Sequence, residues 1–252
     1  MAVIFASRRF FYIFRKEVFH AIEWHVIIVE NNRKESRKMN WIDNGVTRFL
    51  GKVADFMFLN LLWIVCSIPI ITIGASTTAM YSVMLKLVKN EEGYIVKGFL
   101  KAFKENFRQS TLMWLLYLVF GIVIVVDFML LRMMSPSIRT VMQVFLIFMT
   151  ILLISMGIYG FALQARYENP IKNTLKNALI LTVAKMPYTL LMLVITVVPV
   201  VVTFLTVRTL MLGFLVWLLL GVSLIVWLNS LLLRRVFLVF EDIETPEKAE
   251  KI

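Results

Sequence analysis

The stretch that decides the fold reads SIPIITIGASTTAMYSVMLKLVKNEEGYIVKGFLKAFKENFR and covers residues 67–108. It begins inside an apolar run, turns at Pro69 and Gly74, and continues through small hydroxylated residues into a basic amphipathic segment. Proline and glycine at this spacing mark a break between helices. The stretch therefore predicts two apolar helices joined by a turn, followed by a helix that has one charged face.

Composition places this chain among membrane proteins. Hydrophobic residues make up 60% and charged residues 17% of its 252 residues, whereas soluble domains average about 45–50% and about 25%. The apolar residues form long blocks, and roughly 20 such residues cross a bilayer core about 30 Å thick. We therefore expect an all-α, polytopic helical bundle, with the lipid bilayer as its main partner.

The net charge of +11 does not indicate a nucleic-acid partner, because Lys and Arg of membrane proteins collect on cytoplasmic loops. Cys66 is the only cysteine, so intramolecular disulfides are excluded.

Residues 1–38 differ from the rest, because charges break every apolar run and leave neither a span nor a signal peptide. An interfacial helix over residues 10–29 is one interpretation. We prefer a second, in which translation starts at Met39 and residues 1–38 are a spurious or poorly ordered extension. Residues 39–240 then form the transmembrane domain, and residues 241–252 form a charged cytoplasmic tail.

Five clear spans are expected at about residues 49–68, 110–131, 141–164, 188–207 and 210–233. A sixth segment, residues 75–88, has about 14 residues, roughly 21 Å at about 1.5 Å per residue. It is either a re-entrant helix or a thin span whose Lys86 reaches the interface.

Basic residues distinguish these arrangements. With six spans and both termini on one side, 24 of the 27 Lys and Arg residues share that side, which the positive-inside rule predicts to be cytoplasmic. Five spans with an external N-terminus remain open if translation starts at Met39. We expect six spans, with the C-terminus in the cytoplasm and the protein in the plasma membrane.

Two cytoplasmic segments are predicted to be amphipathic helices. Residues 94–108 carry an aromatic and aliphatic stripe opposite a basic one. Asn169 and Pro170 start the second segment as an N-cap followed by proline. The first helix carries Ile95, Phe99, Phe103 and Phe107 on one side and Lys97, Lys101, Lys104 and Arg108 on the other.

Several of these motifs resemble the YesL family of bacterial membrane proteins, a domain of unknown function. The similarity is carried by SIPIITIGAS with NEEGY, by KGFLKAFKENFRQSTLMWLL and by ARYENPIKNTLKNALILTVAKMPYTLL. It extends over about residues 40–241. The resemblance implies a multi-pass plasma-membrane protein, mostly of Gram-positive bacteria, often encoded near carbohydrate ABC transporters. It supplies no established activity and no catalytic residues.

The sequence offers little for catalysis. From Met39 onward it has no histidine and one cysteine, which removes histidine-based triads, zinc sites and histidine-ligated haem. It also has neither glycine-rich nucleotide-binding pattern. We expect no enzyme activity, no catalytic residues, no metal and no cofactor.

Buried polar residues are the remaining candidates, because placing them in a membrane is costly. Asn60, Gln164 and Asn229 most often tie helices together. For Asp127 we favour pairing with Arg132 or hydration over a proton or substrate site. For residues 74–79 we favour close helix packing over a substrate path.

Glu91, Glu92 and Gly93, followed by the helix with Phe99 and Phe103, loosely resemble the docking helix that ABC permeases present to their ATPase subunits. We prefer the interpretation of a surface helix on lipid headgroups, with docking as the functional alternative. Two functions stay open: an accessory or regulatory partner of carbohydrate ABC uptake, which we prefer, and a component that itself moves a sugar or related small solute.

Overall fold

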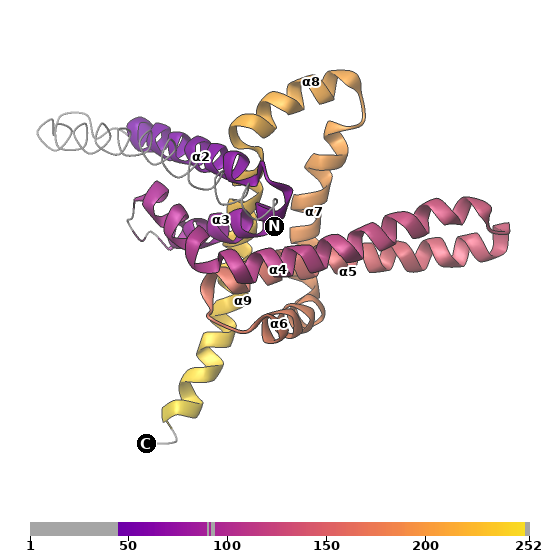
Figure 1. The fold of residues 1–252 in the computed structure, drawn as a ribbon. Coiled ribbons are helices and arrows are strands. Elements are labelled where there is room, and N and C mark those ends of the chain that lie inside the picture. Colours follow the sequence, from indigo (N-terminus) through magenta and orange to yellow (C-terminus); the bar gives the residue numbers. More distant parts are fainter. Residues whose placement is uncertain (1–44, 90, 92–93, 250–252) are drawn as a thin grey trace, which may run out of the picture. The chain divides into compact units, whose positions relative to one another are not determined.

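The computed structural model describes residues 45–89, 91 and 94–249, with side chains for residues 49–89, 91 and 94–238 (Figure 1). The described part is helical and contains no strand. The chain divides into two units, residues 1–54 and 55–252. The predictions for residues 1–38 lie outside the described residues. The elements in chain order are α2 (Gly45–Ser67), η1 (Ile70–Thr72), α3 (Ile73–Val88), α4 (Ile95–Leu130), η2 (Leu131–Met133), α5 (Pro136–Arg166), α6 (Ile171–Ala184), α7 (Met186–Thr203), α8 (Val207–Val216), η3 (Trp217–Gly221) and α9 (Val222–Ala249).

Six described helical segments are long and apolar enough to cross a membrane, which confirms the predicted all-α architecture. The segment expected to be short, residues 75–88, begins earlier and forms 19 helical residues, Ile70–Val88, together with η1. At about 1.5 Å per residue this is roughly 28 Å, close to the bilayer core. The remaining candidate spans are Phe49–Ser67, Ile95–Met133, Pro136–Arg166, Met186–Thr203 and Val207–Leu238.

Helix α3 lies at the centre of the second unit, where it packs against α4, α5 and α9. Gly74 sets the approach of α3 to α4, because a Cβ there would lie 2.5 Å from the Cβ of Trp114 and overlap the carbonyl of Ser110. Such a contact leaves room only for glycine. Close packing, the favoured interpretation of residues 74–79, is therefore what the structure shows for Gly74.

The turn before α3 is held by the hydroxylated residues that the sequence places there. Thr72 donates from Oγ1 to the carbonyl oxygens of Cys66 and Pro69, each at 2.6 Å. Ser76 donates to the Thr72 carbonyl at 3.1 Å. The indole of Trp114 donates to the Ile70 carbonyl at 2.8 Å. These bonds engage carbonyls at the end of α2, at Pro69 and in η1, where the break interrupts the regular helical hydrogen bonding.

Helix α4 differs from the expectation. The predicted surface helix, residues 94–108, and the predicted span, residues 110–131, form one uninterrupted helix of 36 residues, Ile95–Leu130. No proline occurs between Pro69 and Pro136, and a change from an amphipathic to an apolar pattern does not itself end a helix. At about 1.5 Å per residue, α4 is about 54 Å long, so its basic half continues the axis of the span.

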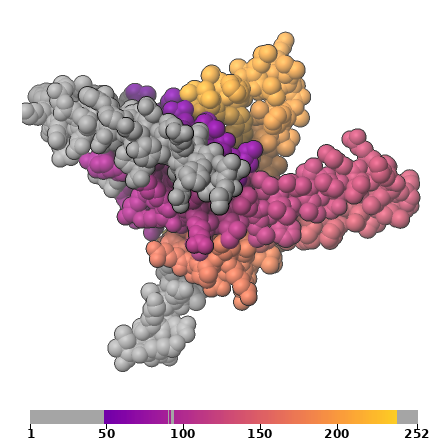
Figure 2. All heavy atoms as spheres, in the orientation of Figure 1, coloured from indigo at the N-terminus to yellow at the C-terminus, as the bar shows by residue number. Residues whose placement is uncertain are grey.

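Helices α4 and α5 form an antiparallel hairpin and run side by side (Figures 1 and 2). Beyond Leu112 in α4 and before Ile151 in α5, most side chains are exposed aliphatic or aromatic groups. Exposed apolar surface of this extent marks contact with lipid or protein. Arg139 closes the hairpin by donating to the Leu131 carbonyl at 3.0 Å and the Arg132 carbonyl at 3.1 Å.

The last apolar segment contains a π-helix. Thr206 and Thr209 form a capping box at the start of α8. Between α8 and α9, Trp217–Gly221 is π-helical, a form that is rare outside single-turn bulges. Helix α9 then continues to Ala249, past residue 240, where the transmembrane domain was expected to end.

Candidate functional site

Asn60, predicted as an intramembrane polar site, is bound completely by the chain itself. Its Nδ2 donates to the carbonyls of Trp217 and Leu218 at 2.9 and 2.8 Å. Its Oδ1 accepts from the backbone N–H groups of Val222 and Ser223, both at 3.1 Å. A π-helical turn disturbs the regular backbone ladder, and one buried amide here satisfies four of its groups. Asn60 therefore links two helical segments, and none of its four hydrogen-bonding positions is available to a solute.

Gln164 is also engaged within the chain, where α4, α5 and the start of α6 meet. Its Nε2 donates to Gln109 Oε1 at 2.7 Å, and its Oε1 accepts from Thr174 at 3.4 Å. Gln109 in turn donates to the carbonyl of Asn169 at 2.7 Å. This amide cluster fixes the loop between α5 and α6, so Gln164 also links helices rather than facing a path.

Asn229 and Asp127 are less completely satisfied. Asn229 donates to Thr196 Oγ1 at 3.0 Å and so ties α9 to α7, and its side chain also makes a polar contact with Tyr81 of α3. Asp127 is half-buried near the end of α4. The predicted pairing with Arg132 is not found among the described ion pairs.

The predicted docking residues separate into different environments. Phe99 is fully buried in the core cluster, so it holds the fold together and does not present a surface to a partner. Phe103 is half-buried and stacks on Phe99, with ring centroids 6.3 Å apart. Glu91 is exposed. Glu92 and Gly93 lie outside the described residues.

The exposed face of this half of α4 is basic. Lys97, Lys101, Lys104 and Arg108 are all exposed and fall on one stripe, because their spacings of four, three and four match the helical repeat. Lys101 makes a loose ion pair with Glu105 at 3.9 Å, with its side chain 77% exposed. We call these four residues the α4 stripe. It is the part of the docking prediction that a partner can reach.

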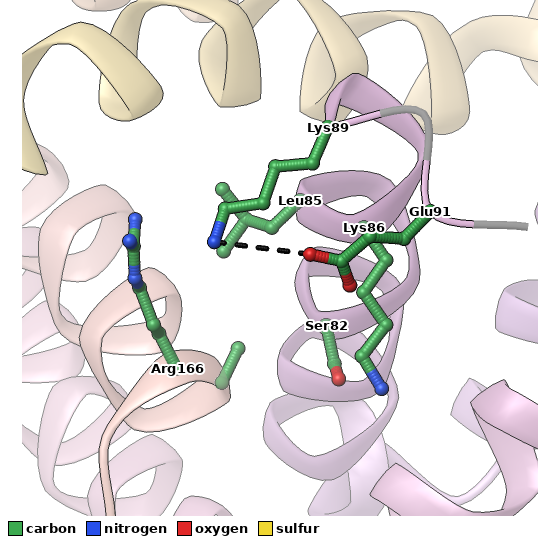
Figure 3. A pocket seen from close by; sticks show the side chains of 7 residues that line it. Ser82, Leu85, Lys86, Lys89, Glu91 and Arg166 are labelled. Carbon is green, nitrogen blue, oxygen red and sulfur yellow. Dashed lines mark ion pairs between the residues drawn. The ribbon is translucent and has the colours of Figure 1, made fainter. Parts of the chain in front are cut away.

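A cleft lies between the C-terminal turns of α3 and α5 (Figure 3). It encloses about 140 Å³. Lys89 reaches across it toward α5, and the Arg166 side chain projects from the α5 side. The sequence search did not identify this cleft, because its cations come from two helices about 80 residues apart. We call it the cationic cleft; it is lined by Ser82, Leu85, Lys86, Lys89, Glu91, Ala165 and Arg166.

The described residues contain no group of three or more His, Cys, Asp or Glu side chains that could hold a metal ion. Several accessible groups of the described residues are basic. They include the α4 stripe, the cationic cleft, and Arg234 and Arg235 beside an apolar groove along α9. These groups suit acidic partners and phosphate-bearing ligands.

Comparisons with known proteins assign no role to this chain. The profile of a family described as "Protein of unknown function, DUF624" matches residues 56–128, from α2 to the end of α4. "Uncharacterized protein YteU" of Bacillus subtilis (strain 168) is 28% identical over 156 residues, which cover 60% of this chain and 69% of YteU. No solved structure matches the chain. The first described spans are thus similar to a family of unknown function.

Proposed function

We propose that this protein is a non-enzymatic accessory or regulatory partner of carbohydrate uptake by an ABC-type transporter in the plasma membrane. The observation that supports the proposal most is the occupancy of Asn60, whose four hydrogen bonds all go to the chain's own backbone. Gln164 is similarly engaged. A solute path needs polar side chains that are available to the solute, and these two are not.

The α4 stripe supplies the docking surface of the proposal. It lies on a helix whose opposite side is anchored by Phe99, so a partner would meet a rigid surface rather than a loop. Rigid presentation reduces the entropy lost on binding. The expected partner, a carbohydrate ABC permease or its ATPase subunit, rests on the resemblance to the YesL family.

Charge reversal on the α4 stripe tests this role. The variant Lys97→Glu with Lys101→Glu changes two exposed side chains four residues apart. Lys172→Glu with Lys176→Glu makes the same change, with the same spacing, on exposed positions of α6, and serves as the matched control. The membrane is extracted in mild detergent, crosslinked, and purified through a C-terminal tag. Mass spectrometry should then find the permease or ATPase with the wild type and with the α6 control. Recovery from the α4 variant should fall at least about tenfold.

A second function, a component that itself moves a sugar or related solute, is favoured by one observation. Thr78 on α3 and Ser230 on α9 each keep a buried hydroxyl without a partner among the described residues. Uptake of labelled sugar by liposomes that contain only this protein would support transport and contradict the accessory role. Absence of uptake, together with crosslinks from the α4 stripe, would support the accessory role.

A further inference from the structure

We propose that the cationic cleft binds a phosphate group, carried either by an anionic phospholipid headgroup or by a free phosphate ligand. The proposal does not depend on the accessory role. The first observation is the charge of the lining: among the described residues, Lys86, Lys89 and Arg166 line the cleft with a single carboxylate, Glu91. The lining therefore keeps a net charge of +2 around about 140 Å³, roughly ten times the 10–15 Å³ that a water molecule needs.

The lysines are not required to cap the end of α3. The carbonyl of Lys86 accepts backbone N–H groups from Lys89 and Glu91, at 3.0 and 3.1 Å. The carbonyl of Val88 accepts from Arg234 Nη1 at 2.9 Å. Lysine side chains near a helix C-terminus often bind its last carbonyls. Because other donors occupy these two carbonyls, the ammonium groups of Lys86 and Lys89 can bind a ligand.

The carboxylate of Glu91, the one counter-charge among the described lining residues, is weakly held. Lys89 Nζ lies 4.0 Å from Glu91 Oε1, and the two side chains are 39% and 55% exposed (Figure 3). An exposed pair at this distance contributes little. A phosphate group offers several anionic oxygens and would replace Glu91 as the partner of Lys89.

Arg166 is positioned by aromatic rings. Its Cζ lies 5.6 Å from the ring centroid of Tyr167 and 5.1 Å from that of Phe237. Phe237 is fully buried, and its ring meets Tyr167 edge-on at 5.9 Å. Stacked aromatic faces orient a guanidinium without neutralising it. The two rings thus hold the Arg166 guanidinium at the cleft wall.

The expected position of the cleft along the membrane normal places it at the level of the lipid phosphates. Residues 56–85 and 140–165 contain no Asp, Glu, Lys or Arg. Lys86 and Arg166 are therefore the first charges after two long uncharged segments, which is where lipid phosphates lie in a bilayer. Basic pockets between transmembrane helices at this level bind anionic headgroups.

The test uses the full chain, purified in a neutral detergent and titrated with phosphatidylglycerol, with phosphatidylcholine as the zwitterionic reference, whose phosphate is neutralised by its choline. Binding is followed by native mass spectrometry. Lys86→Gln with Lys89→Gln should weaken phosphatidylglycerol binding by roughly fivefold per lysine, the usual contribution of a basic residue at an anionic surface. Lys172→Gln with Lys176→Gln removes the same charge outside the cleft and should change binding less than about twofold.

Glu91→Gln gives a test in the opposite direction. Removing the competing carboxylate should tighten binding about two- to fivefold, which loss of a merely structural contact would not do. Competition by inorganic phosphate would identify a free phosphate ligand, and its failure would identify the lipid headgroup; both support the cleft. Equal binding by the cleft and α6 lysine variants, or weaker binding by the Glu91 variant, would overturn the proposal.

Discussion

Replacing Asn60 by leucine should destabilise the protein far more than the same replacement elsewhere in the bundle. The change keeps the side-chain size but removes four hydrogen bonds between α2 and the segment around η3. Interhelical hydrogen bonds in membrane proteins average about 0.6 kcal/mol and reach about 1.7 kcal/mol each. Four such bonds correspond to about 2.4 to 7 kcal/mol. Because the π-helical turn can relax and recover part of its backbone bonding, we expect about 2–4 kcal/mol.

Asn229→Leu is the matched control. Asn60 and Asn229 are both buried, with 0% and 1% of their surface exposed, but Asn229 donates one hydrogen bond, to Thr196, and makes one further polar contact, with Tyr81. Its replacement should lower the free energy of unfolding by about 0.6–1.7 kcal/mol. Both values can be measured by titrating the protein in mild detergent with sodium dodecyl sulfate. If Asn60→Leu is no more destabilising than Asn229→Leu, the four-bond tie to η3 is refuted.

Two further predictions concern packing and topology. Gly74→Ala should separate α3 from α4 and destabilise the fold by about 1–3 kcal/mol. The control Gly157→Ala, with nothing within 4 Å of the new Cβ, should be neutral or slightly stabilising. Equal free energies of unfolding for the two variants in a denaturant titration would contradict the close contact at Gly74. In a Cys66→Ser background, a cysteine replacing Ile68 should react with a membrane-impermeant maleimide from outside, and one replacing Tyr94 only after permeabilisation. Labelling of both positions from the same side would contradict a crossing α3.

The sequence predicted the helical spans well because length and hydropathy decide them. It also predicted the turn before α3 at Pro69, whose ring restricts the backbone locally. The turn expected at Gly74 was wrong, because Gly74 lies inside α3 and serves its close packing on α4. The uninterrupted α4 was missed because the change of pattern near Arg108 was treated as a boundary. The absence of proline from residues 70–135 was the available signal.

The site residues were harder to predict because their partners are distant in the chain. Asn60 binds backbone groups 157 to 163 residues away, and no local pattern encodes that pairing. The stripe containing Phe99 was correctly identified as one face of a helix. Its direction was not, because periodicity alone does not tell whether an aromatic face meets a partner or the chain's own α3.

The pairing of α3 with the first half of α4 constrains where the α4 stripe can lie. A Cβ added at Gly74 would meet Ser110 and Trp114, and one added at Gly98 would lie 3.7 Å from Val83. The start of α3 therefore lies beside the middle of α4, and the end of α3 lies beside the start of α4, so the two helices run antiparallel. A charged residue at the bilayer centre costs about 2.5–3.5 kcal/mol, and four would cost about 10–14 kcal/mol, comparable to the stability of a whole domain. The α4 stripe must therefore reach the headgroups along its aliphatic stems. If α3 crosses the membrane, it is surrounded mainly by other helices of the chain rather than by lipid, as its many buried residues show.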